Sequence, residues 1–509
     1  MGKKKTRAGH AKREEGLLGS LRIYSIVFFS GACVMVLEIL ASRVIAPYYG
    51  TGLFVWSSII SVILASLSIG YYIGGRMADY KPSIQFLCYA LFLAGLLTAL
   101  SPLLKDAYVL SGIRPEFKYG GLVLSALLFA LPSLLLGFVA PYSVRIAARS
   151  IKHVGGTAGS LYAVSTVGSI AGTLAAGFWL IPSYGVTSII YGVSLVLVLL
   201  SLTGIKRKTL FAFVSAIVII PLALSFLAPP EYPVLFVTDS EYYKITVYED
   251  PGELSRRMKL DASRAGGVYL NSDHHLCDYS EITHLAYALN PEPERILVIG
   301  LGPGTQTKDA YTMFPNARVD VIEIDGAQVG VAEEYFGLDK SKVSSLQAGD
   351  ARALLSTSKE KYDVIIVDAF VSKFSVPYHL ITKEFIQVLS SHLTEDGVVC
   401  VNVISAVEGG RSPFFKSAYA TYSSVFPVLY VVPSQSWAPE FIQNIMILAK
   451  KNGEQLSCTQ FAELAKSSGD ELAAKWADSC IDEPVKDQHP IILTDDYVPV
   501  DSLLATVYQ

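Results

Sequence analysis

Four acidic side chains in the second half of this chain stand where short apolar runs end. Glu323 and Asp325 close "VDVIEID", Asp350 follows "KVSSLQAG", and Asp368 closes "YDVIIVD". A carboxylate can accept hydrogen bonds from hydroxyl and amino groups, and it can take a proton from a reacting nitrogen. These residue types therefore predict recognition of a polar ligand, with one of the carboxylates available as a base.

A glycine-rich turn comes before the first of these acids. In "ILVIGLGPGT", Gly300, Gly302 and Gly304 follow an apolar run, and glycine lets the backbone come close to a ligand. A turn that binds a dinucleotide would need glycine at position 305, which is Thr305. The spacing favours an adenosine without a diphosphate, of the S-adenosylmethionine type, over a nicotinamide cofactor. A pocket that has lost its ligand is the third alternative.

The acids can be assigned roles in such a pocket. Glu323 is placed to accept from both ribose hydroxyls, with Asp325 beside it. The string "GDA", which contains Asp350 and Ala351, is placed to accept from the adenine amino group. We therefore expect these four residues and the three glycines of the turn to bind the cofactor.

A parallel sheet is needed to bring the acids together. From Arg295 onward, short runs rich in Val and Ile alternate with helix-like segments, as in buried parallel strands covered by helices. In such sheets ligands bind at the carboxyl ends of the strands, which is where the acids and glycines stand. We predict a doubly wound α/β sheet of the Rossmann-like, class I methyltransferase type over residues 291–509. The last two runs, "VLYVVPS" and "NIMILAK", lack a helix between them and are candidates for an antiparallel edge pair.

The segment before this sheet alternates polar and apolar residues. "DSEYYKITVYED" and "RRMKLDASRAGGVYLNSD" are broken by Gly and Asp, as half-buried strands joined by turns are. We predict a small β domain over residues 231–290, after the proline-rich hinge "APPEYP".

The first half has the composition of a membrane bundle. The chain of 509 residues is 51% hydrophobic and 17% charged, and residues 22–230 hold apolar runs of roughly 20 residues, enough for a helix to cross a bilayer. The predicted architecture is a basic tail at residues 1–21, a helical bundle in the lipid bilayer, and a water-exposed domain. About seven spans are expected, at residues 22–46, 54–75, 84–104, 121–142, 158–181, 186–202 and 210–226.

Lys and Arg are unevenly distributed between the connections of these spans. The tail and every second connection are rich in them, whereas the alternating connections hold only Lys105, Arg114 and Lys118. Since basic loops are retained inside, the N-terminus is expected on the cytoplasmic side of the cell membrane and the C-terminal domain outside. An adenosyl-sulfonium cofactor is made inside cells, so three alternatives are open: one apolar run is not a full span, the cofactor reaches the outer face through the bundle, or the domain binds something else there. The net charge of -4 and the lack of a basic stripe argue against a nucleic-acid partner. A homo-oligomer is left open.

The order of these motifs resembles the spermidine synthase (aminopropyltransferase) family. The matching strings include "YSEITH", "PERILVIGLGPG", "VIEID", "GDARALL", "YDVIIVDAF", "VPYHLITKEF" and "LTDDYVPV", and the span-rich first half is similar to membrane-fused members. The resemblance implies transfer of an aminopropyl or methyl group from decarboxylated S-adenosylmethionine or S-adenosylmethionine to a small amine-type substrate. It implies Asp368 as the base and Tyr279 on the substrate side. His275, near the expected substrate mouth, is an ordinary polar loop residue, an acceptor contact or, as a third alternative, a metal ligand.

Three departures from the family pattern concern the acceptor side. Pro303 stands where the family has an acidic residue, Val371 stands where a second Asp completes D-x-x-D, and Glu281 and His284 are three rather than four residues apart. Two lost carboxylates leave two alternatives open. Either the acceptor has changed, or the chain is a non-catalytic sensor or assembly protein with a residual pocket. A third alternative, a transporter of polyamine-like cations, would use Glu38 in the first span.

The cysteines are scattered without the spacing of a metal-ligand set, so no metal site is expected. Cys458 and Cys480 bracket a polar helical segment, and a disulfide between them is expected if the domain faces outward. Near the end of the chain, Asp495 and Asp496 either present carboxylates to a cationic substrate or belong to a turn or helix cap.

Overall fold

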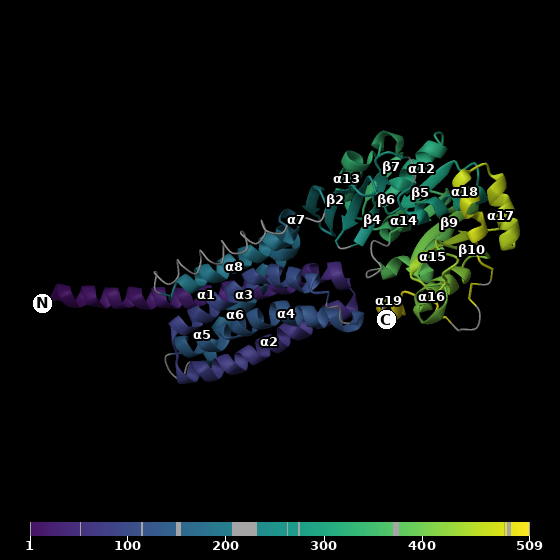
Figure 1. Cartoon of the computed structure of the whole chain (residues 1–509). Coiled ribbons are helices and arrows are strands. Elements are labelled where there is room, and N and C mark those ends of the chain that lie inside the picture. Colours follow the sequence, from purple (N-terminus) through teal and green to yellow (C-terminus); the bar gives the residue numbers. More distant parts are fainter. Residues whose placement is uncertain are drawn as a thin grey trace. The chain divides into compact units, whose positions relative to one another are not determined.

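The chain divides into two compact units, Met1–Pro229 and Pro230–Gln509. The first is built of helices, and the second contains two sheets with their helices (Figure 1). Buried hydrophobic residues form separate cores in the two units. The structure is a computed structural model, and it describes residues 2–50, 52–112, 116–148, 154–205, 232–261, 263–272, 275–369, 376–482, 484–485 and 490–507.

The N-terminal unit consists of apolar helices. They are α1 (Gly2–Tyr49), α2 (Leu53–Tyr80), α3 (Ile84–Leu110), α4 (Phe117–Gly137), α5 (Val139–Ala147), α6 (Val154–Ala175), α7 (Ile181–Ser183) and α8 (Val186–Leu202), with a π-helical turn at Ala176–Leu180. Within the described residues, five stretches are long and apolar enough to cross a membrane: Ser20–Tyr49, Leu53–Tyr80, Ile84–Leu110, Lys118–Ala147 and Val154–Leu180. They match the first five predicted spans. The sixth predicted span is the shorter helix α8, and the seventh, 210–226, lies outside the described residues.

Helices α1 and α6 approach each other backbone to backbone. A Cβ at Gly168 would lie 2.1 Å from the carbonyl oxygen of Phe28, and one at Gly172 would lie 2.4 Å from that of Ala32. Only glycine leaves room for this approach, which is typical of helix pairs in membranes. Glu38 of α1 is half-buried in this unit.

The second unit begins with a small antiparallel sheet in the order β1-β2-β3-β4. Its buried face, which includes Ile245, Val247 and Met258, packs on Val331 and Phe336 of helix α13. The predicted strands are therefore present, and they lie in the same compact unit as the larger sheet. The bounds are β1 (Val234–Asp239), β2 (Lys244–Asp250), β3 (Ser255–Leu260), β4 (Ser263–Tyr269) and α13 (Gly326–Phe336).

The larger sheet has seven strands in the order β10-β11-β9-β8-β5-β6-β7. Strands β5 to β9 run parallel to one another, while β11 is antiparallel to both β9 and β10. The predicted Rossmann-like sheet and the antiparallel pair are confirmed, with β11 inserted between β9 and β10. The bounds are β5 (Arg295–Ile299), β6 (Arg318–Glu323), β7 (Ser345–Ala348), β8 (Tyr362–Val367), β9 (Leu393–Ser405), β10 (Val428–Pro433) and β11 (Gln443–Lys450).

Both faces of this sheet are buried, which explains the continuous apolar runs of its strands. In β5, Leu297 and Ile299 belong to one buried cluster and Ile296 and Val298 to another, as the two-residue period of a strand requires. The other helices of the unit are α10 (Asp278–Ile282), α11 (His284–Leu289), α12 (Thr305–Met313), α14 (Ala351–Thr357), α15 (Lys383–Ser391), α16 (Pro413–Ser423), α17 (Cys458–Ser467), α18 (Glu471–Trp476) and α19 (Val500–Val507). Short 3-10 turns lie at Lys340–Lys342, Tyr378–Leu380, Gly409–Arg411 and Ala477–Ser479.

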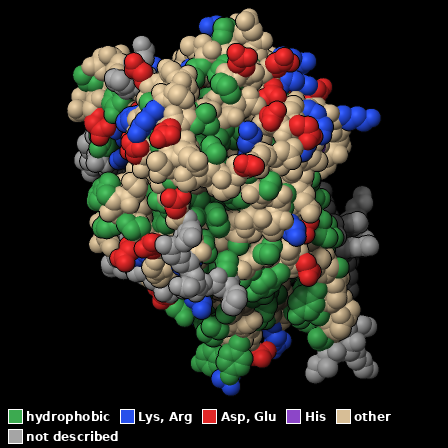
Figure 2. All heavy atoms as spheres, turned by 90° about the vertical axis from the view of Figure 1, so that its right-hand side faces the viewer, with side chains coloured by type: hydrophobic (Ala, Val, Ile, Leu, Met, Phe, Trp, Pro, Cys, Tyr) green, Lys and Arg blue, Asp and Glu red, His purple; other side chains and the backbone are tan. Residues whose placement is uncertain are grey.

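Charged side chains of both signs share the surface drawn in Figure 2. Acidic and basic groups are interspersed over the upper part of this face, so positive charge there is broken up by negative charge among the described residues. Such a distribution differs from the basic stripe of a nucleic-acid-binding surface.

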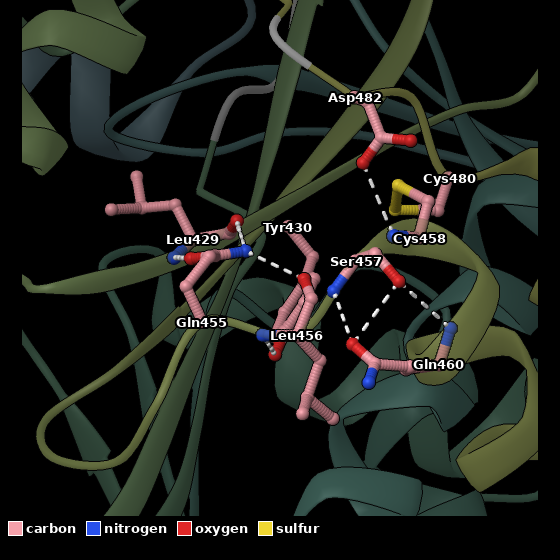
Figure 3. Close-up of a disulfide and its surroundings, with 9 residues drawn as sticks. All are labelled: Leu429, Tyr430, Gln455, Leu456, Ser457, Cys458, Gln460, Cys480 and Asp482. Carbon is pink, nitrogen blue, oxygen red and sulfur yellow. Dashed lines mark hydrogen bonds between the residues drawn. A yellow bond between two sulfur atoms is a disulfide. The ribbon is translucent and has the colours of Figure 1, made fainter.

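Helices α17 and α18 form a hairpin that a disulfide closes (Figure 3). Cys458, the first residue of α17, is bonded to Cys480, 22 residues later. Ser457 and Gln460 form a capping box at the start of α17, and the Cys458 N–H donates to the Asp482 carboxylate at 3.1 Å. The disulfide, which we expected if this domain faces outward, is therefore present.

Candidate active site

The glycine turn lies against the end of strand β8. Gly300, Gly302 and Gly304 have φ angles of 92°, 51° and 83°, in the region that glycine adopts most readily. A Cβ at Gly300 would lie 2.3 Å from the main-chain oxygen of Asp368, and one at Gly302 would lie 3.3 Å from that of Ala265 in β4. The turn is held between β4 and β8 and brings the end of β5 beside Asp368.

Glu323, at the end of β6, holds the turn in place. Its carboxylate accepts from the Leu301 N–H at 2.7 Å, the Asp325 N–H at 2.9 Å and the Gln328 amide at 3.0 Å. Burial raises the pKa of this carboxyl to about 7, although the backbone donors act in the opposite direction. The Ile324 N–H is a fourth donor, so the roughly four acceptor positions of an ionised carboxylate are taken, and a ribose hydroxyl bound here would have to displace one of these donors.

Asp325 links this region to the small sheet. It is the N-cap of α13, where one oxygen accepts from the Ala327 N–H at 3.1 Å, and the other accepts from the Ser240 hydroxyl at 2.6 Å. Ser240 lies in the turn between β1 and β2. In the same turn, burial and then the charge of Glu323 raise the pKa of the Tyr243 phenol. The small sheet thus contacts the acids that were predicted to bind the cofactor.

Asp350 and Ala351 are at the start of helix α14. One Asp350 oxygen accepts from the Ala353 N–H at 2.8 Å, and the other lies 2.6 Å from Nε2 of His379. The Asp350 side chain is 34% exposed, so a ligand can reach it. His379 was not predicted as a site residue, and its one signal in the sequence is its place in the string "VPYHLITKEF".

Asp495 is paired within the protein. The Arg352 guanidinium contacts both of its oxygens, with Nη1 2.7 Å from Oδ1. Thr494 and Tyr497 exchange backbone hydrogen bonds, so this segment is a turn. Of the two alternatives for "TDD", the turn is therefore present.

Asp368 is half-buried at the end of β8 and is held from three sides. Its carboxylate accepts from the Gln306 amide at 2.8 Å, from the Asn402 amide at 3.0 Å and from the Tyr279 hydroxyl. Burial raises the pKa of the Asp368 carboxyl, and the three donors act against this rise. The result is an oriented carboxylate that accepts a proton more readily than an ordinary aspartate.

Gln306 and Asn402 were not among the predicted site residues, and both are buried. The side-chain oxygen of Asn402 accepts from the side-chain amide of Asn444 at 3.0 Å. Two side-chain amides therefore connect β11 through β9 to Asp368. An asparagine inside the apolar run "GVVCVNVI" is a signal for Asn402, because a buried amide needs partners. Gln306, in the first turn of α12, has no comparable signal.

Tyr279 in α10 faces the carboxylate of Asp368 as a hydrogen-bond donor. Burial raises the pKa of its phenol well above the ordinary value, and the charge of Asp368 adds to the effect. The phenol is therefore protonated at neutral pH and can orient the carboxylate.

Pro303 packs against the small sheet. A Cβ placed on Gly266 of β4 would lie only 3.0 Å from Cγ of Pro303. An apolar ring thus occupies the turn where the family pattern has an acid. Val371, which stands at the position of the other lost carboxylate, lies outside the described residues.

His275 and Glu281 have partners in other parts of the unit. His275 Nε2 lies 3.2 Å from Oδ1 of Asp309 in α12. Glu281 accepts from the Trp476 indole at 2.8 Å and from Lys475, both in α18. The structure therefore places His275 beside Asp309, while Glu281 links α10 to the disulfide-closed hairpin.

Known proteins resemble the second unit. The model of the spermine/spermidine synthase domain matches residues 277–460. A polyamine aminopropyltransferase of Vibrio vulnificus (strain CMCP6) is 29% identical over 230 residues, covering 44% of this chain and 75% of the relative. A polyamine aminopropyltransferase of Streptococcus uberis (strain ATCC BAA-854 / 0140J) is 30% identical over 217 residues, covering 40% of this chain and 73% of the relative. The crystal structure of a probable spermidine synthase from Corynebacterium glutamicum covers 49% of this chain and 94% of its own, with 18% identity and a TM-score of 0.40.

Proposed function

This chain belongs to the spermine/spermidine synthase family, and from that premise we propose that it is a membrane-anchored transferase. Its second unit would bind decarboxylated S-adenosylmethionine or S-adenosylmethionine and transfer an aminopropyl or methyl group to an amine-type acceptor. The observation that carries the proposal is the Asp368 carboxylate, which Gln306, Asn402 and Tyr279 orient beside the glycine turn.

A bound adenosyl-sulfonium would supply the electrophilic carbon next to sulfur. When the acceptor nitrogen bonded to that carbon, the carbon–sulfur bond would break and the neutral thioether would leave with the electron pair. Asp368 takes the surplus proton from nitrogen, and its raised pKa suits it to that role. Tyr279 and Asn402 keep the accepting oxygens in one orientation.

The residues around the turn fit an adenosine. A ribose hydroxyl could replace one of the donors to Glu323, and the buried side-chain oxygen of Gln328 beside it lacks a partner within the described residues. Asp350 is exposed enough to accept from an adenine amino group. Asp325 supports the turn that Glu323 holds, through their shared hydrogen bond.

The test uses purified full-length protein with each cofactor and a panel of monoamines and diamines. We expect formation of the thioether nucleoside and the alkylated amine with at least one pair. Asp368→Asn should lower kcat by about 10²- to 10⁴-fold, the usual contribution of a general base, while nucleoside affinity is kept. Asp363→Asn, on the opposite end of β8, is the matched control and should retain turnover. Absence of both turnover and cofactor binding would contradict the proposal.

A non-catalytic member with a residual nucleoside pocket is the second candidate, and Pro303 is the observation that favours it. An apolar ring replaces the family acid at the turn, so one charge that would hold a cationic donor is lost. Under this alternative the double variant Asp368→Ala/Glu323→Ala would keep full function in cells. Loss of function in that variant would favour the transferase.

We further propose that the second unit lies outside the cytoplasm. The Cys458–Cys480 disulfide and the charge asymmetry of the span connections support this placement. The test labels introduced cysteines in intact cells with a membrane-impermeant maleimide. Lys359→Cys, exposed in the second unit, should react, while Lys81→Cys, exposed in a predicted inside loop, should react only after lysis. The opposite pattern would overturn the placement.

A further inference from the structure

A second cluster of chemically active side chains lies apart from the acids of the turn. It contains His275, which follows β4, His284 at the start of α11, and Asp309 in α12. One nitrogen or oxygen from each side chain lies within 4.8 Å of the others. Three separate elements therefore direct two imidazoles and one carboxylate toward a common point.

The spacing of these atoms suits a small cation. His275 Nε2 lies 3.2 Å from Asp309 Oδ1, and His284 Nε2 lies 3.6 Å from Asp309 Oδ2. Ligands about 2.0 to 2.2 Å from a tetrahedral zinc ion are about 3.3 to 3.6 Å apart. The separation from His284 agrees with that range and the one from His275 is 0.1 Å shorter, each to a different oxygen of Asp309, so small side-chain movements would bring the three groups around one ion.

Three buried atoms in the cluster lack a hydrogen-bond partner within the described residues: His284 Nε2, His275 Nδ1 and Asp309 Oδ2. The His284 and His275 side chains are only 6% and 9% exposed, so water gives them little solvation. A proton on His284 Nε2 would point at an oxygen 3.6 Å away, beyond good hydrogen-bond distance. A cation between His284 Nε2 and Asp309 Oδ2 would give both atoms a partner.

Asp470 provides the outer support that metal-bound histidines usually have. Its Oδ2 lies 2.8 Å from Nδ1 of His284, and its Oδ1 accepts from the Leu472 and Ala473 N–H groups at the start of α18. A carboxylate on Nδ1 keeps a proton there, so Nε2 is the nitrogen that a metal would take, displacing any proton it carries. The ring of His284 is therefore oriented as a ligand.

We propose that His275, His284 and Asp309 bind one divalent transition metal ion, with Asp470 as the supporting carboxylate. Two imidazoles and a carboxylate are the ligand set of zinc sites and of other borderline divalent metals, and they leave further positions open. The sequence spacing predicted no metal site, because the ligands come from separate elements.

The ion would act as a structural clamp near the candidate active site. His284 follows helix α10, which carries Tyr279, and Asp309 lies one turn after Gln306 in α12. Tyr279 and Gln306 are both donors to Asp368. Binding of the metal would therefore hold two of the three groups that orient Asp368. The inference does not depend on the proposed function.

The test is metal binding by the full-length protein, purified in detergent and stripped with a chelator. Titration with Co²⁺ should reach one equivalent with visible d–d bands, and Zn²⁺ should displace it. His275→Gln and His284→Gln should each abolish binding. His379→Gln is the matched control, since His379 also pairs with an aspartate but lies outside the cluster. This variant should bind Co²⁺ as the wild type does.

Asp470→Asn should weaken the affinity for Co²⁺ by about 10- to 100-fold without changing the stoichiometry, as expected of a supporting carboxylate. X-ray absorption of the zinc-loaded wild-type protein should show two imidazoles and one carboxylate, a result that needs no variant to fold. Binding by the wild type that is no stronger than binding by a His275→Gln/His284→Gln double variant would overturn the proposal. All these readouts are independent of turnover.

Discussion

Asp368 is subject to two opposing influences on its protonation. Burial raises the pKa of its carboxyl, and the hydrogen bonds from Asn402, Gln306 and Tyr279 lower it. Each donor stabilises the charged form, so the number of donors sets where the group titrates. A base built this way can be tuned by residues that never contact the substrate.

Asn402→Leu removes one of these donors at similar volume. With one donor lost, the charged form of Asp368 is less stable and its pKa rises, so the acidic limb of the pH profile of kcat/KM should move to higher pH. A shift of about one unit is reasonable for one hydrogen bond to a carboxylate. Asn444→Leu, which acts only through Asn402, should give a smaller shift in the same direction. An unchanged profile in Asn402→Leu would exclude a positioning role.

Glu323 predicts a pH dependence for nucleoside binding. The pKa of its carboxyl is about 7 when folded, above the unfolded value of 4.5, and an ionised carboxylate is the better acceptor for ribose. Affinity for an adenosyl ligand should therefore rise about tenfold from pH 6 to pH 8, measured by calorimetry. Glu323→Gln should bind more weakly and lose this dependence; the same pH dependence in that variant would contradict the assignment.

The same carboxyl affects stability in the opposite direction. Its folded pKa lies above its unfolded pKa, so its stabilising effect is complete below pH 4.5 and is lost as the pH rises through about 7. The ligand-free protein should thus become less stable over the range in which it binds nucleoside better.

At the scale of elements, the site depends on how closely the β5 turn approaches β8. A Cβ at Gly300 would lie 2.3 Å from the Asp368 main-chain oxygen, whereas one at Gly337 would meet nothing within 4 Å, although its φ is also positive. A substitution at Gly337 therefore tests backbone strain alone, and the same substitution at Gly300 tests strain together with close contact.

Gly337→Ala should cost about 1 to 2 kcal/mol from the left-handed conformation alone. Gly300→Ala should cost about 1 to 3 kcal/mol more, because the methyl group must push β8 away. It should also abolish turnover by moving Asp368, while Gly337→Ala stays active. Thermal unfolding of the full-length variants measures the difference, and equal losses would show that the contact at Gly300 is easily relieved.

The sheet could be predicted because its strands are buried on both faces. The runs that became β5, β6 and β8 are rich in Val and Ile, and the acids at their ends share one edge by the geometry of parallel strands. The position of β11 between β9 and β10 has no such local cause, since pairing order depends on the packing of the whole sheet. For the same reason the cluster of His275, His284 and Asp309, taken from three elements, could not be read from spacing.

At the scale of the whole molecule, the disulfide closes a hairpin that contacts helices of the candidate site. It closes the hairpin of α17 and α18, and α18 and its N-cap provide the partners of Glu281 and His284: Trp476 and Asp470. A change in this hairpin therefore reaches the helices that carry Tyr279 and the proposed metal ligand.

Removing the disulfide should destabilise the second unit by about 3 kcal/mol, as expected for a loop of this size. A reductant should lower the thermal midpoint of the wild-type protein, while Cys458→Ser/Cys480→Ser should start from the lower value and not respond. Metal affinity should fall along with stability, since Asp470 lies within the closed loop. If the reductant left the thermal midpoint of the wild-type protein unchanged, the disulfide would contribute little to stability.

The order of strands also has a consequence for how the protein is made. β10 leaves the ribosome before β11, yet its neighbour in the sheet is β11, which must enter beside β9. Until residue Lys450 has emerged, the edge of β9 is open and β10 has no template, a state in which exposed strands tend to associate wrongly. We therefore expect a nascent chain of this protein to be most prone to wrong strand pairing late in translation, before Lys450 has emerged.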